Sequence, residues 1–286
     1  MALIRNTASM QLTGRVGNTT YYSQAGRQVA RVAQNSSNYG ESARRTLTQQ
    51  KRRVKWANLV NFYRISANWM KGSFETRSRK ESDYNKFMSV NIPSARVNLT
   101  KREASTGACV LDEFIISQGS LMSLSLSRAE GKLNTGLIIS SSHVGEEVTV
   151  SEFSRYIVME NPQLSLGMQL SFLVYAQLFT DDMVPHVTME RFELTLDSSD
   201  NSLLQSHFGR YTLSVSEYVL HIGNISDGTF VSLVVSDNST GALRVSSQRL
   251  LKGSLTTAEE YATPEKELEA ANSYGIDVET FLTPGY

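Results

Sequence analysis

The sequence predicts an α+β fold that is mainly β. The chain has 286 residues, of which 40% are apolar and 20% charged, so it can bury one or two cores. One long helical pattern occupies residues 46–72. Short alternating segments then recur from 121 to 249 at the spacing typical of a β-sandwich. We therefore expect a basic hairpin and helical domain at 1–119, an immunoglobulin-like sandwich at 120–255 and an acidic C-terminal arm at 256–286.

The N-terminal part is typical of a β-hairpin. Thr19 to Ser23 is rich in β-forming residues, Ala25-Gly26 favours a turn, and residues 28–33 alternate between polar and apolar side chains. A two-stranded hairpin is only marginally stable by itself. We therefore expect it to lie against the helix, the sandwich or another subunit.

Residues 46–72 predict a basic amphipathic helix. Thr46 and Gln49 have the spacing of a capping box, and Gly72 favours a left-handed stop. A second helix at 82–91, closed by Pro93, is expected to pack on the first and complete a helix pair. The apolar stripe of the first helix is expected at Trp56, Val60, Tyr63, Ala67 and Met70, widened by Leu59, Phe62 and Trp69.

Most other patterned segments are expected to be strands. The exceptions are a short helix capped by Ser151 and ended by Pro162, and a helix from Pro264 to Tyr274 that Gly275 stops. Residues 168–179 are apolar on both sides, which favours an inner strand. The expected strands are 97–100, 109–117, 121–127, 133–141, 146–150, 168–179, 187–197, 229–237 and 242–250.

The net charge of zero conceals two oppositely charged halves. Up to Arg102 there are 19 Lys+Arg and 4 Asp+Glu, which gives +15; from Glu103 onward there are 9 and 24, which gives −15. Three explanations stay open. The halves neutralise each other within one molecule, they do so between neighbouring copies, or the basic half contacts nucleic acid.

This charge split predicts an assembly interface. The arm at 256–286 is acidic and has few apolar residues, so we expect it to reach beyond its own sandwich. It would dock on a neighbouring copy or on the basic half. The predicted interface residues are Arg44, Arg45, Lys51, Arg52, Arg53, Lys55, Glu265, Glu267, Glu269, Ile276 and Phe281.

No catalytic, cofactor or metal site is predicted. The four histidines, at 143, 186, 207 and 221, lack the spacing of a metal site, and the single cysteine, Cys109, is expected to be a small buried hydrophobe. Adjacent carboxylates such as Glu146 and Glu147 are expected in solvated turns. We therefore predict a protein that is not an enzyme and needs no cofactor.

The sequence also predicts a protein made in a cytoplasm and not held in a membrane. The first residues, MALIRNTASMQLTG, lack the apolar run of a secretory signal. No stretch approaches the roughly 20 apolar residues of a membrane span.

Several motifs resemble a known family. They are TGRVGNTTYYSQAGRQVARV, TLTQQKRRVKWANLVNFYR, SDYNKFMSVN, LTKREASTGACV and SYGIDVETFLTPG. Together they resemble a protein family encoded by gut Bacteroidetes and by their crAss-like phages. The resemblance covers most of the first 120 residues and about the last 15. It transfers no activity to any residue.

The resemblance implies a structural protein of a phage virion, made in the host bacterial cytoplasm. Such a protein would be a subunit of a portal-proximal ring or of the tail. Its expected partners are further copies of itself and other virion proteins. The alternative is a virion or host binding module that contacts nucleic acid, including packaged DNA, through the helix at 46–72.

Overall fold

The computed structural model describes residues 2–3, 13–16, 19–24, 27–32, 47–78, 80–254 and 256–274. The fold is mixed α+β with mostly sheet, as predicted. The chain divides into two compact units, residues 1–50 and 51–286. This division differs from the predicted boundary at 119/120, because helical residues before that boundary share a hydrophobic core with strands that follow it.

The N-terminal unit contains a small antiparallel sheet with the strand order β1-β4-β3-β2. The predicted hairpin is confirmed, since β3 and β4 pair from Thr19 opposite Val32 to Gln24 opposite Arg27. The Arg31 guanidinium lies 5.5 Å from the centre of the Tyr22 ring, a cation–π contact. The strands are β1 Ala2–Leu3, β2 Gly14–Val16, β3 Thr19–Gln24 and β4 Arg27–Val32.

The two predicted long helices are confirmed as α1, Leu47–Met70, and α2, Asp83–Asn91. Gly72 has a φ of +87° directly after α1, which is the expected left-handed stop. Ser82 caps α2 by accepting a hydrogen bond from the backbone N–H of Asn85. Thr46, the predicted cap of α1, lies outside the described residues.

The buried face of α1 agrees in part with the predicted stripe. Leu59, Phe62 and Met70 are buried, and Val60, Tyr63 and Trp69 pack against the same core. Its buried residues are Val54, Asn58, Leu59, Asn61, Phe62, Ser66 and Met70. Trp56 is instead exposed, at 42%, while Val60, Tyr63 and Ala67 are half-buried. The prediction missed the buried polar residues, because an apolar pattern assigns asparagine to solvent, whereas this helix buries Asn58 and Asn61 against backbone carbonyls.

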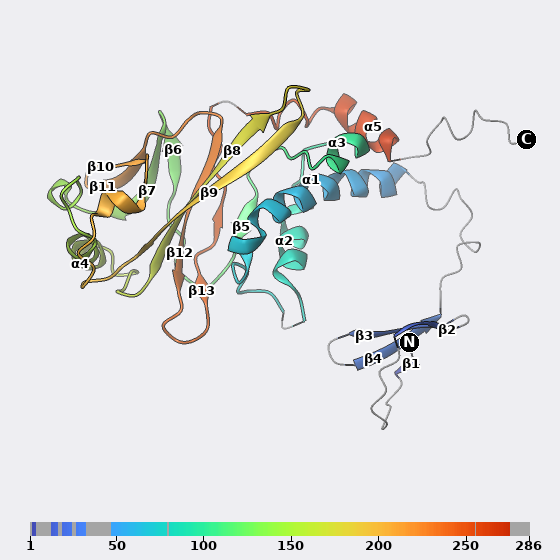
Figure 1. Cartoon of the computed structure of the whole chain (residues 1–286), viewed down its shortest axis with the longest axis horizontal. Helices are drawn as coiled ribbons and strands as arrows, with labels where there is room; N and C mark the ends of the chain where they lie inside the picture. The colour runs from blue at the N-terminus through green and yellow to red at the C-terminus, as the bar shows by residue number, and fades with distance from the viewer. Residues whose placement is uncertain are drawn as a thin grey trace, which may run out of the picture. The chain divides into compact units, whose positions relative to one another are not determined.

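Two four-stranded antiparallel sheets form the centre of the second unit (Figure 1). The inner sheet has the order β13-β12-β8-β9, and the outer sheet has the order β10-β11-β7-β6. The strands are β6 Ser127–Ala129, β7 Lys132–Ile138, β8 Gln169–Phe179, β9 Pro185–Thr195, β10 Thr212–Ser216, β11 Val219–Gly223, β12 Thr229–Asp237 and β13 Arg244–Val245. A separate pair joins β5, Ile115–Ser117, to β14, Gln248–Arg249.

The inner sheet is buried on both faces. Leu170, Phe172 and Val174 of β8 enter the core between the two sheets. The alternate residues Leu173 and Tyr175 enter a second core, which also contains residues of α1 and α2. The unit is thus three layers, helices on sheet on sheet, as Figure 1 shows. This confirms the prediction that residues 168–179 form an inner strand.

Side-chain amides replace a neighbouring strand along residues 109–115. Asn58 donates to the carbonyl of Val110 at 2.7 Å and accepts from its N–H at 2.9 Å. Asn91 does the same for Ile115, at 2.9 and 2.8 Å. We call such a two-bond contact with one residue's backbone an amide clamp. Of the predicted strand at 109–117, only β5 is therefore a strand.

Other predicted strands were also wrong. Residues 97–100 form no strand, since Asn98 donates its N–H to the carbonyl of Tyr261 at 2.8 Å. Residues 121–126 make only one bridge, and Thr149 within the predicted strand at 146–150 is the cap of α4. Ser151 is thus not the cap. The hairpin of β10 and β11 was not predicted.

The remaining helices complete the unit. Thr100 and Glu103 form a capping box at the start of α3, Lys101–Ser105, a helix that was not predicted. Thr263 caps the predicted C-terminal helix, which is confirmed as α5. No helix in the described part of the chain is long and apolar enough to cross a membrane. The other elements are α4 Val150–Glu160, α5 Pro264–Ser273 and the 3-10 turns Ser141–His143 and Leu204–His207.

Candidate assembly surface and serine groove

Two predicted interface residues form an ion pair within the chain. The Lys51 ammonium of α1 lies 3.3 Å from a carboxylate oxygen of Glu267 in α5. Both side chains are more than a third exposed, so this pair adds little to stability but fixes a register between the two helices. Part of the charge split is therefore neutralised within one molecule.

The arm docks on its own basic half as far as it is described. Ser273 of α5 accepts a hydrogen bond from the Lys101 N–H at 2.8 Å, and the Tyr261 hydroxyl donates to Glu103 at 3.2 Å. Ala258 is buried with residues of 97–110 in a small core. The two predicted docking sites of the arm were a neighbouring copy and the basic half. Residues 256–274 thus contact the basic half of their own chain.

Arg52 and Arg53 remain exposed on the first turns of α1. No described acidic side chain lies within ion-pair distance of either guanidinium. The first turn of α1 also carries no acidic residue. The positive end of the helix dipole therefore adds to these charges and leaves the surface open to an anionic partner.

Trp56 lies beside these arginines, one helical turn further along. Residues three and four positions apart on a helix are neighbours, so Arg52, Arg53 and Trp56 form one patch. The indole N–H donates to the Tyr84 hydroxyl at 3.0 Å, and the two rings meet edge to face with centroids 6.2 Å apart. This bond fixes the indole while 42% of the residue stays exposed. We call Arg52, Arg53 and Trp56 the basic patch.

The other predicted interface residues are not brought to this patch. Lys55 is half-buried and Glu265 is exposed, and neither forms an ion pair with a described residue. Glu269 pairs with Lys266 at 2.8 Å on its own helix. Arg44, Arg45, Ile276 and Phe281 lie outside the described residues.

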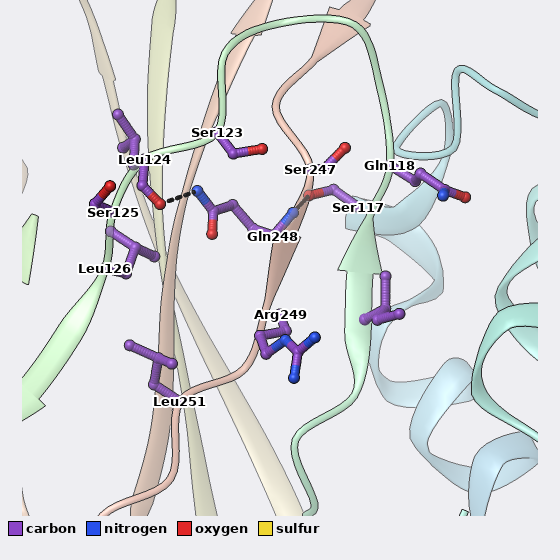
Figure 2. Close-up of a pocket in the computed structure, with 11 residues that line it drawn as sticks. Ser117, Gln118, Ser123, Leu124, Ser125, Leu126, Ser247, Gln248, Arg249 and Leu251 are labelled. Atoms are coloured by element: carbon purple, nitrogen blue, oxygen red, sulfur yellow. Dashed lines mark hydrogen bonds between the residues drawn. The ribbon is translucent and has the colours of Figure 1, made fainter. Parts of the chain in front are cut away.

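A second feature, absent from the sequence analysis, is a groove of about 390 Å³ beside β14 (Figure 2). Its lining contains four serines, at 117, 123, 125 and 247, with Gln248 and Arg249 among the other polar groups. Leu124, Leu126 and Leu251 supply apolar wall. We call it the serine groove. The alternation in LMSLSLS, residues 121–127, was the sequence pattern that could have indicated this groove, but it was interpreted as a paired strand.

The described residues give limited support for catalysis. Ser202 and His207 lie 2.9 Å apart, a pair that sequence reasoning missed, and His143 contacts Glu152 at 3.2 Å. Neither histidine has a described hydrogen-bond partner for its second ring nitrogen, which a serine nucleophile would need to orient its base. No group of three or more described His, Cys, Asp or Glu residues could hold a metal ion.

Cys109 is buried, as the sequence predicted. Burial raises the pKa of its thiol, because a thiolate would lose solvation in this apolar surrounding. The thiol therefore stays protonated and unreactive at neutral pH.

Comparison of the sequence with protein-family models finds no match. Comparisons with curated proteins and with solved structures find none either.

Proposed function

We propose that this chain is a structural subunit of a phage virion, in a portal-proximal ring or in the tail, and that it has no enzymatic role. The proposed role in assembly rests on one observation, the basic patch. Arginine and tryptophan are the residues that most often dominate binding energy at protein interfaces, and here they are exposed side by side. The virion setting is supported by the resemblance of the N-terminal and C-terminal motifs to crAss-like phage proteins.

The proposed partner of the patch is an acidic protein surface on a neighbouring subunit. Residues from Glu103 onward carry a formal charge of −15, so a second copy offers such a surface. Complementary charges at an interface fix partner and register more than they raise affinity. Copies arranged head to tail would bring basic and acidic halves together and close into a ring.

The double variant Arg52→Glu, Arg53→Glu tests this proposal. We expect the assembled fraction to be lost, because like charges would then face each other, while the thermal unfolding midpoint stays unchanged. The measurement is molar mass by light scattering across a concentration series. The matched control is Lys71→Glu with Arg102→Glu, which changes the same number of exposed charges outside the patch. Unchanged assembly in the first variant would contradict the proposal.

A nucleic-acid partner is the second candidate. The observation that favours it is the charge of +15 over residues 1–102, together with the Arg31–Tyr22 contact in the N-terminal sheet. Binding of duplex DNA that weakens steeply as salt rises, and that is lost in the Arg52→Glu, Arg53→Glu variant, would favour this candidate over a protein partner.

We also propose that the sandwich belongs to the immunoglobulin-like class. Its support is the pair of four-stranded antiparallel sheets that enclose one core. The location of the gene tests the virion setting separately. We expect it beside genes for terminase, portal or capsid proteins, and a distant location would contradict that setting.

A further inference from the structure

The serine groove is a place where two parallel segments separate without pairing. At one end Leu121 donates its N–H to the carbonyl of Val245 at 3.0 Å, and it forms a parallel bridge with Ser246. Beyond this point the segments 121–126 and 246–251 make no backbone hydrogen bond to each other. One side-chain hydrogen bond also joins the two segments: the Gln248 amide donates to the carbonyl of Leu124 at 3.1 Å (Figure 2).

The backbone of the groove wall therefore keeps unused hydrogen-bonding groups. The N–H groups of Met122, Ser123 and Ser125 have no partner among the described residues. Backbone N–H groups are paired almost everywhere in folded proteins, by protein or by water. Free backbone groups of this kind are what an added β-strand uses to bind, and here they continue to Ser125, where the Leu126 N–H turns back to the Leu124 carbonyl.

The side chains of the groove specify what kind of strand fits. Leu126 and Leu251 offer apolar contact on one side. Arg249 is exposed, and its guanidinium has no ion-pair or hydrogen-bond partner within the described chain. Gln248 is only 8% exposed, and its amide oxygen has no described partner. The groove thus suits an extended peptide with apolar side chains on one face and carboxylates on the other.

The chain carries a segment with this pattern. In GIDVETFLTPGY, residues 275–286, the apolar Ile276 and Val278 alternate with the acidic Asp277 and Glu279. Alternation with a period of two places apolar side chains on one face of a strand and acidic side chains on the other. This segment lies outside the described residues, directly after α5.

We propose that the serine groove receives residues 275–286 of a neighbouring copy as an added β-strand. The carboxylates of Asp277 and Glu279 would face Arg249, and Ile276 and Val278 would contact the leucines. This proposal rests on the proposed function, since it supplies the second contact of the assembly.

The position of α5 favours a neighbour over the same chain. The segment before α5 packs beside Val184, in the turn that leads from β8 into β9. The groove lies by β14, next to β12 and β13, which occupy the other side of the inner sheet. A segment that has to cross the sheet before it reaches the groove leaves fewer of its 12 residues to bind there, which favours the segment of a neighbouring copy.

Peptide binding tests the groove directly. The probe is a fluorescent GIDVETFLTPGY peptide, added to the full chain carrying Ile276→Ser and Val278→Ser, which disables its own segment. We expect saturable binding by anisotropy, weakened at least tenfold by Arg249→Glu. A peptide with Asp277→Lys and Glu279→Lys should bind only the Arg249→Glu protein. Absence of binding, or equal binding by both proteins, overturns the proposal.

Mixing two defective chains tests the neighbour. One chain carries Arg249→Glu, and the other carries Ile276→Ser and Val278→Ser. We expect each alone to stay unassembled and the mixture to form mixed dimers, since one intact groove and one intact segment remain. No mixed dimer means that the segment binds its own chain, which overturns the proposal. If the unmodified chain assembles but its groove does not bind the peptide, only this inference is overturned. If the unmodified chain never assembles, the proposed function is overturned.

Discussion

The two faces of the inner sheet are packed in different ways. Between the sheets, the core is built from aliphatic and aromatic side chains, and each strand finds its backbone partners in neighbouring strands. On the opposite face, α1 and α2 pack over an irregular segment, 109–115, whose backbone has few strand partners. There Asn58 and Asn91 supply the missing bonds. Apolar packing suffices where the backbone is regular, and buried amides are needed where it is not.

Of the variants that test this difference between the two faces, Asn58→Leu is expected to lower the free energy of unfolding most. The leucine is similar in size, but it leaves the N–H and the carbonyl of Val110 buried without partners. Each unpaired buried group costs about 1 to 3 kcal/mol, so we expect the two to lower the free energy of unfolding by about 2 to 6 kcal/mol, measured by urea denaturation.

Two controls accompany this variant. Asn85→Leu, on the exposed side of α2, should change stability by less than about 0.5 kcal/mol. Leu233→Met, in the core between the sheets, should cost less than about 1.5 kcal/mol, because it conserves volume and removes no hydrogen bond. If Asn58→Leu is as mild as Leu233→Met, the two faces do not differ as described.

A smaller effect of opposite sign is expected from Tyr175→Phe. The Tyr175 hydroxyl and the Ser66 hydroxyl are buried on the helix-covered face, and neither has a hydrogen bond of regular geometry. Burial raises the pKa of Tyr175, and Ser66 lies near enough to oppose this rise in small part, so the hydroxyl stays neutral but unsatisfied. Removing it should raise stability by up to about 1 kcal/mol, measured as the urea midpoint. Destabilisation by more than that amount would mean that the hydroxyl has a partner.

The smallest effect concerns the contact between the arm and α3 at high pH. Burial, and then the nearby Glu103 carboxylate, raise the pKa of Tyr261 to about 12, above its ordinary value of 10.0. Below pH 10 the proton is held in both folded and unfolded states, so stability is constant. From about pH 10 to about 12 only the folded state keeps it, so stability falls. Tyr261→Phe should remove this part of the decline, which unfolding curves between pH 9 and 12 would show.

The sequence predicted the elements whose signal is local. The stop of α1 at Gly72, the start of α5 at Pro264 and the doubly apolar pattern of β8 each depend on neighbouring residues only. The hairpin of β3 and β4 was found for the same reason.

What the sequence missed depends on contacts distant along the chain. The burial of Asn58 in α1 depends on Val110, which lies 52 residues later and accepts its hydrogen bond. The serine groove was mistaken for a strand, since LMSLSLS alternates as a paired strand would, but only its two end residues, Leu121 and Ser127, pair with another segment. Arg52 and Arg53 are exposed, and their role in an interface stays a prediction.

The hydrogen bond from Lys101 to Ser273 also sets an order of events during synthesis. Its two residues are 172 positions apart. At about 5 to 20 residues per second, a ribosome needs roughly ten to thirty seconds to make the intervening chain. During that interval the nascent chain displays Lys51 and the 97–110 segment uncovered by α5. The contacts of α5 with Lys51 and with the 97–110 segment can therefore form only after the whole sandwich has been synthesised.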